Sequence, residues 1–142
     1  MRVITLWQPW ATLMAIGAKT FETRHWSTPY RGELGIHAGA TLDKESLLEP
    51  AIQEALGRAG YTKAEELPSR AILCVVKLVG CHSTDMCPKP IVERIKLEFP
   101  FGNYSGGRFA WETRMVRAFK SPIPARGAQG FWNWPFDWRA FE

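Results

Sequence analysis

The 142-residue chain lacks any long apolar run, and this absence excludes a membrane-spanning helix, which needs about 20 consecutive apolar residues. Its first ten residues also lack the basic head, apolar body and small-residue cleavage site of a secretory signal. We therefore expect a cytoplasmic protein that has no membrane partner. The length corresponds to about one domain, so we predict a single domain over residues 1–142.

Cysteine is scarce: the chain has Cys74, Cys81 and Cys87. An odd number of cysteines without an export signal argues against a disulfide framework. The segment 81–87 adds His82 to two of the cysteines, but a structural zinc site needs a fourth ligand and usually a Cys-x-x-Cys pair, which the sequence lacks. We therefore predict ordinary thiols, no metal site and no cofactor.

Positive charge is in slight excess, and aromatic residues are abundant. The chain carries 18 Lys and Arg against 14 Asp and Glu, a net charge of +4. This excess favours polyanionic partners without identifying one. The seven Trp residues are more informative, because an indole N–H needs a polar partner and suits a site with one wet edge. We expect about half of them to lie in the core.

The apolar spacing predicts an α+β fold. Strands are expected at residues 3–6, 20–24, 32–40, 71–81 and 108–119. Helices are expected at 10–16, at 47–56 with a break at Pro50, just after a capping box at 62–65, and at 88–98. Strand 71–81 is apolar on both faces except at Lys77, so we expect it to be central. Short strands with turn signals favour a small β-barrel with short flanking helices.

Two stretches near the start place polar and aromatic side chains together. Gln8 and Trp10 stand at the mouth of the first predicted helix, where free N–H groups favour anions, although a hydrophobic staple would use the same residues. Lys19 follows the helix stop and is expected in a loop, free to reach a phosphate. Glu22 and Arg24 share one face of an extended segment and are predicted to pair, next to Trp26. The competing interpretation is a solvated charged strand.

Three later stretches carry further candidates. Arg31 lies in a Pro-Tyr-Arg-Gly turn, and His37 faces away from the apolar side of its strand, where a structural role is the more common one. A glycine-rich segment brings Tyr104 and Arg108, and such a loop can approach phosphate or simply close a hairpin. The tail interleaves three further candidates with glycine, a pattern that suits stacking on bases: Arg126, Gln129 and Trp132.

In this order the motifs resemble a known family. Leu-Trp-Gln-Pro-Trp-Ala, Gly-x-Lys-x-x-Glu-x-Arg-x-Trp and Thr-Pro-Tyr-Arg-Gly-x-Leu-x-Ile-His-Ala are similar to the opening of ASCH domains, the activating-signal-cointegrator homology domains of the PUA-like superfamily. Gly-Arg-Phe-Ala-Trp and Arg-Gly-x-Gln-Gly-Phe-Trp resemble the end of the same domain. The resemblance implies a barrel-like core with a cleft, and a role with RNA or nucleotides.

Three hypotheses on function follow. The leading one is a module that binds nucleic acid, RNA above DNA, in a basic, aromatic-lined cleft. The second is a hydrolase acting on RNA or a modified nucleoside such as N4-acetylcytidine, since some ASCH relatives hydrolyse a modified cytidine with a Lys-x-x-Thr pair and an acid. Here Lys19, Glu22 and Thr23 would be catalytic, although Glu22 stands at the third position after Lys19 and Lys77 stands where an acid was expected. The third is an adaptor that docks through an exposed Trp-rich tail.

Overall fold

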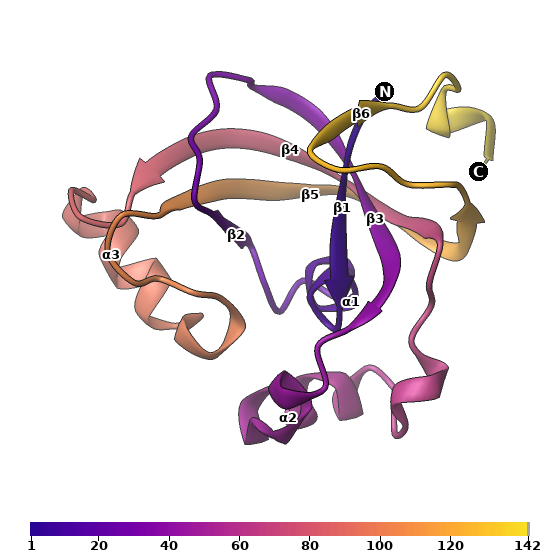
Figure 1. The fold of residues 1–142 in the computed structure, drawn as a ribbon, viewed down its shortest axis with the longest axis horizontal. Coiled ribbons are helices and arrows are strands. Elements are labelled where there is room, and N and C mark those ends of the chain that lie inside the picture. The colour runs from indigo at the N-terminus through magenta and orange to yellow at the C-terminus, as the bar shows by residue number, and fades with distance from the viewer. Residues whose placement is uncertain (142) are drawn as a thin grey trace.

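The computed structural model describes residues 1–141 and confirms the α+β class. Within these residues one mixed sheet has the strand order β2-β5-β4-β3-β1-β6 (Figure 1). Its strands are β1 (Arg2–Gln8), β2 (Phe21–Arg24), β3 (Gly32–Leu42), β4 (Ala71–Ser83), β5 (Phe109–Pro124) and β6 (Phe131–Asn133). The α-helices are α1 (Trp10–Ala15), α2 (Pro50–Arg58) and α3 (Lys89–Lys96). β1 and β3 are parallel, and the other neighbours are antiparallel. None of these helices is long and apolar enough to span a bilayer.

The sheet curls strongly but does not close, so the expected barrel is wrong in this respect. Its edge strands are β2 and β6, and in residues 1–141 no backbone ladder joins one to the other. Both are short, and β6 pairs only with Arg2–Ile4 at the start of β1. The second half of β1 therefore faces β2 across a gap that is lined by side chains. Arg24 Nη2 spans this gap by donating to the carbonyl oxygen of Thr5 at 3.2 Å.

Apolar side chains cover both faces of the central strand β4. One face packs against the inside of the curl, where Ile36, Val76 and Trp111 lie. On the other face, Ile72 and Val75 pack against the C-terminal segment, which contributes Trp134 and Trp138. The prediction that this strand is buried on both faces is confirmed, and Lys77 is its exposed exception.

The helical segments follow the sequence signals closely. The chain breaks where Pro50 forbids a continuous helix: a 3-10 turn covers Glu45–Leu48, and α2 starts afresh at Pro50 with the Glu49 side chain capping it. The cap near residue 62 is closed by Glu66, which accepts from the Thr62 and Lys63 amides, and it opens only a 3-10 turn.

In strand β5 the alternating sequence predicts Trp111, Thr113 and Met115 on one face, but the run of buried side chains ends at Thr113. Met115 is 43% exposed, and all residues from Arg114 to Ala118 are exposed. The reason is that β2 covers only Phe109–Glu112, while the ladder to β4 shifts register between Val75 and Val76.

Candidate functional site

Two connected hollows open along the gap between β1 and β2. The smaller, called here the inner pocket, has a volume of about 360 Å³ and is lined by Thr5, Leu6, Trp7, Trp10, Lys19, Glu22, Thr23, Arg24, His25, Asp43, Gly102, Asn103 and Arg108. The larger, called the outer groove, has a volume of about 1210 Å³ and extends over Trp26, His37, Gly39 to Thr41, Arg70 and the loop 124–130. Thr5, Trp7, Arg24 and His25 line both hollows.

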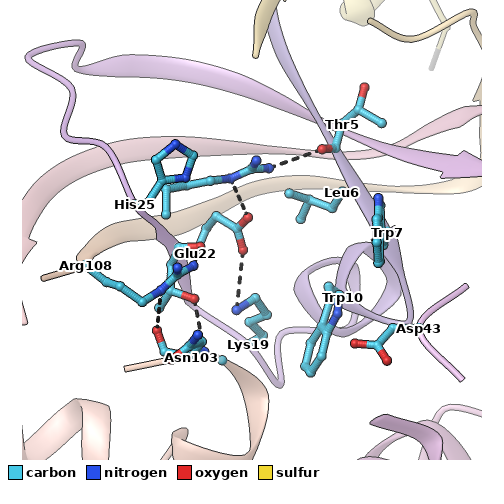
Figure 2. A pocket seen from close by; sticks show the side chains of 13 residues that line it. Thr5, Leu6, Trp7, Trp10, Lys19, Glu22, His25, Asp43, Asn103 and Arg108 are labelled. Carbon is cyan, nitrogen blue, oxygen red and sulfur yellow. Dashed lines mark hydrogen bonds and ion pairs between the residues drawn. The ribbon is translucent and has the colours of Figure 1, made fainter. Parts of the chain in front are cut away.

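The inner pocket has an aromatic wall and a polar wall. Trp7, Trp10 and Asp43 stand on one side, and His25, Arg108 and Asn103 stand on the other (Figure 2). The aromatic wall comes from β1 and the start of α1, the helix predicted at residues 10–16. Lys19 and Glu22 lie between the two walls.

Glu22 is the centre of the charge arrangement. Its Oε1 lies 3.5 Å from Lys19 Nζ and its Oε2 lies 2.9 Å from Arg24 Nε, as the dashed lines in Figure 2 mark. The predicted pairing of Glu22 with Arg24 is confirmed. Because the carboxylate is buried between two cations, it holds both in place.

Lys19 is not the free loop side chain that the sequence suggested. It is 3% exposed, and its Nζ donates to the carbonyl oxygen of Phe101 at 2.6 Å. The chain folds back after α1, where the Lys19 amide donates to Leu13, and this turn directs the side chain inward. Burial lowers the pKa of Lys19, while the nearby carboxylates of Glu22 and Glu98 act in the opposite direction.

The loop before β5 carries Asn103 and Arg108 of the polar wall and is fastened to β2. The Asn103 amide donates to Thr23 Oγ1 at 3.1 Å, and Arg108 donates to the carbonyl oxygens of Asn103 and Thr23. Glu98 accepts from the Thr20 and Phe21 amides at 2.7 and 3.2 Å. Thr23 and Arg108 therefore line the pocket with their backbone positions fixed.

Tyr104 belongs to the same loop but does not line the pocket. Its hydroxyl is buried with no hydrogen-bond partner among the described residues. Burial, together with Glu98 and Glu22, raises the pKa of this phenol.

His37 organises the outer groove. Its Nε2 lies 2.7 Å from the carbonyl oxygen of Ala125, which can only accept, so Nε2 carries the proton. Nδ1 then accepts from Thr5 Oγ1 at 3.1 Å, and Thr5 in turn accepts from Trp132 Nε1 at 3.0 Å. Burial lowers the pKa of His37, which agrees with a neutral ring. This chain of hydrogen bonds fixes the loop 125–130 against the sheet.

The structure brings most of the predicted residues to one region. Trp10, Lys19, Glu22, Thr23, Arg24 and Arg108 line the inner pocket, and Trp26, His37, Arg126 and Gln129 line the outer groove. The order of the motifs along the sequence therefore converges on the gap between β1 and β2.

Four predicted residues lie outside the lining of both hollows: Gln8, Arg31, Tyr104 and Trp132. Gln8 is buried. Its side chain donates to Thr12 Oγ1 and to the carbonyl oxygen of Pro68, and it accepts from the Thr12 amide in the first turn of α1. Arg31 donates to carbonyl oxygens of its own turn. Trp132 is held by Thr5, as described above.

The structure bears on two further expectations about aromatic rings. Trp26 lines the groove with a half-buried ring, which also packs edge-on against Trp111 and Phe131, with centroids 4.7 and 5.4 Å away. The adaptor hypothesis required an exposed Trp-rich tail, yet Trp134 and Trp138 are buried.

Sequence reasoning missed several lining residues, of which Trp7 is the most exposed aromatic, at 56%. Its signal was present: Leu6 and Trp7 alternate on a strand, and a buried Leu6 directs Trp7 outward. His25, Asp43, Asn103 and Arg70 were also missed. These four lie in turns and loops, where no periodicity reports direction.

Comparisons with known proteins agree with the architecture. The chain is 30% identical to human (Homo sapiens) Activating signal cointegrator 1 over 135 residues, and 37% identical to the protein of that name from Mus musculus. Each match covers 92% of this chain and 22% of the relative, so the chain spans about a fifth of those proteins. The crystal structure of ASCH from Zymomonas mobilis superposes with a TM-score of 0.52 at 17% identity, covering 87% of this chain and 72% of that one, and shows the same fold. Residues 4–123 match the ASCH domain, and the chain therefore belongs to the ASCH domain family.

Proposed function

We propose that the chain binds single-stranded nucleic acid, RNA in preference to DNA, with one base in the inner pocket and the backbone along the outer groove. The observation that carries this proposal is the position of Trp7. Its exposed ring lines both hollows, as Arg24 does, and it stands across the inner pocket from the cation Arg108. A base that stacks on such a ring gains about 1–3 kcal/mol whatever its identity.

The charges of the two hollows suit this arrangement. Lys19, Arg24 and Arg108 face Glu22 and Asp43 in the inner pocket, an excess of one positive charge. The outer groove adds Arg70 and Arg126 and has no Asp or Glu among its lining residues. A weakly charged pocket suits a base, and a basic groove suits phosphates.

Membership of the ASCH family favours RNA as the ligand class, because the PUA-like fold is often associated with RNA. The mammalian relatives are about five times longer than the matched region. Their name therefore does not identify a ligand for this chain.

A titration of single-stranded RNA at several salt concentrations tests the proposal. Trp7→Ala should weaken binding by about 1–3 kcal/mol and leave the salt slope unchanged, because it removes stacking and no charge. Arg108→Gln should weaken binding and lower the log–log slope by about 0.7. Arg58→Gln, an exposed change on α2, is the matched control and should do neither. Failure of the folded parent to bind mixed-sequence RNA at low salt would refute the proposal.

A second candidate function rests on Lys19. A buried amine with a lowered pKa, held by Glu22 and beside Thr23, is a candidate base or nucleophile for hydrolysis of a modified nucleoside. Incubation with N4-acetylcytidine should then release cytidine, and Lys19→Met should abolish the release while Lys63→Met leaves it intact. An unchanged substrate after prolonged incubation with the parent would reject this function and leave the binding proposal standing.

A further inference from the structure

The outer edge of β5 is open along most of its length. β2 pairs with β5 only over Phe109–Glu112, and the Thr113 amide makes one more bond to Thr20. Beyond this point β5 borders only β4 within residues 1–141, and it arches along the sheet away from α3 (Figure 1). Its residues from Arg114 to Ala118 are exposed, as is Lys120.

This open edge carries charge of one sign. Residues 113–136 contain Arg114, Arg117, Lys120 and Arg126 and no Asp or Glu. Lys77 of β4 lies directly opposite Arg114 in the ladder, so both side chains stand on the same face of the sheet. The carboxylate facing them from β3, Glu33, is engaged by Arg139 Nη2 at 2.7 Å and Trp138 Nε1 at 3.1 Å.

The facing pair Lys77 and Arg114 is a second observation that points to a ligand. Like charges directly opposite each other in a sheet destabilise it. In the described part of the chain, no carboxylate lies within ion-pair distance of Lys77, Arg114 or Lys120. A polyanion lying on the sheet would offset this repulsion.

The basic edge is continuous with the outer groove. Pro124 ends β5 and lines the groove, and Arg126 follows two residues later in the same lining. From Arg114 to Lys120 the strand extends about 20 Å, a length over which one strand of a duplex carries about six phosphates.

We propose that Lys77, Arg114 and Lys120, called here the basic strip, bind the phosphate backbone of nucleic acid where it leaves the outer groove. Contacts of the strip with phosphates would hold the ligand in place and carry no sequence information. This inference rests on the proposed function and adds to it a second contact surface, which only a long ligand reaches.

The test compares a 4-nucleotide and a 20-nucleotide single-stranded RNA of mixed sequence. The triple variant Lys77→Gln, Arg114→Gln, Lys120→Gln should bind the short RNA as the parent does. It should bind the long RNA about tenfold or more weakly at 50 mM salt, with a log–log slope lower by about 2, because three contacts contribute about 0.7 each. Removing the Lys77–Arg114 repulsion should leave the melting temperature unchanged or raise it.

The control triple variant Arg58→Gln, Lys63→Gln, Lys89→Gln removes the same charge from exposed positions on the helical side. If both triple variants weaken binding of the long RNA equally, the effect comes from net charge alone. This result would refute the role proposed for the basic strip. So would an unchanged affinity of the first variant for the long RNA while the parent binds both RNAs. Binding of neither RNA by the parent would overturn the proposed function itself, and the strip with it.

Discussion

Gly127 marks the tightest approach between the outer groove and the sheet. A Cβ atom at this position would lie 2.6 Å from His37 Cε1 and 2.7 Å from Thr5 Oγ1. Neither side chain can yield easily, because both belong to the hydrogen-bonded chain that ends at Ala125. The loop can therefore lie where it does only with glycine at this position.

We predict that Gly127→Ala destabilises the protein by about 1–3 kcal/mol, as overpacking does, and weakens RNA binding by displacing the loop. Urea unfolding and the RNA titration measure the two effects. The same substitution at Gly57 is the control. It lies within α2 with nothing within 4 Å of its Cβ position, so Gly57→Ala should stabilise the protein by about 1 kcal/mol. If Gly127→Ala changes neither stability nor RNA binding, the loop moves freely.

Glu22 has a larger structural role than its pairing with Arg24 suggested from the sequence. It is also the carboxylate nearest the buried ammonium of Lys19. Glu22→Gln should therefore lower the free energy of unfolding by about 3–5 kcal/mol, because it leaves a buried charge without its partner.

A double-mutant cycle checks this account of Glu22. Combining Glu22→Gln with Lys19→Met removes both charges, so the double variant should be more stable than the sum of the two single changes predicts. Strictly additive losses would contradict the coupling.

At the scale of elements, the sequence predicted what local pattern and composition determine. Pro50 marked the fresh start of α2, and the apolar run from residue 71 marked a central strand with Lys77 as its exposed position. The extent of β5 and its open edge were not predictable. They depend on where β2, which is more than 80 residues away in the sequence, stops pairing with it.

Helix α3 packs on the sheet through Ile95, which contacts Phe21 and Ala110, and through a charged cluster. Glu112 of β5 accepts from Arg94 Nη1 at 2.6 Å and lies 3.0 Å from His82 Nε2. Burial acts to raise the pKa of Glu112, but the bonds and charges of His82 and Arg94 outweigh it, so the pKa is lowered.

We predict that Glu112→Gln destabilises the protein by about 1–3 kcal/mol and leaves RNA binding intact, since none of the three residues lines the inner pocket or the outer groove. Thermal unfolding and the RNA titration provide the measurement. Lys96→Gln, which breaks an exposed pair with Glu93 on the same helix, should change stability by less than about 0.5 kcal/mol. A similar small loss at Glu112 would mean that the cluster does not anchor α3.

At the scale of the whole molecule, His37 and Glu112 make stability depend on pH in the same direction. Folded His37 binds its proton less tightly than the unfolded chain does, so proton uptake as the pH falls below about 6.5 favours unfolding. Glu112 adds to this below about pH 4.5, where the unfolded carboxyl takes up a proton before the folded one.

The melting temperature should therefore be highest near neutral pH and fall in two stages on acidification. His37→Gln should lower the melting temperature at pH 7 and remove the first stage, while Glu112→Gln should reduce the second. Melting curves from pH 7.5 to 3.5 for the parent and both variants test this. An unchanged first stage in His37→Gln would assign it to another group.

The candidate site was predictable in its composition and not in its shape. Motif order brought Lys19, Glu22, Arg24 and Arg108 to attention, and the structure places all four in one pocket. Which side chains are buried was not readable, because Lys19 and Gln8 are polar residues whose partners, Phe101 and Pro68, are supplied by distant loops. The exposed ring of Trp7 was missed in the sequence, and Trp26, which was predicted at the site, packs partly against the core.

The incomplete pairing of β1 has a consequence for how the site should be dissected. Because β6 pairs only with Arg2–Ile4, every second peptide group of β1 beyond Ile4 presents its main-chain donor and acceptor toward the gap, and Arg24 uses one of them, the carbonyl of Thr5. A ligand in the gap can bond to the peptide groups of Thr5 and Trp7 just as an added strand would, whereas those of Leu6 face β3. Alanine scanning cannot remove such bonds, so the summed losses of side-chain variants should fall short of the total binding energy. Replacing an amide of β1 with an ester by chemical synthesis would reveal the missing share.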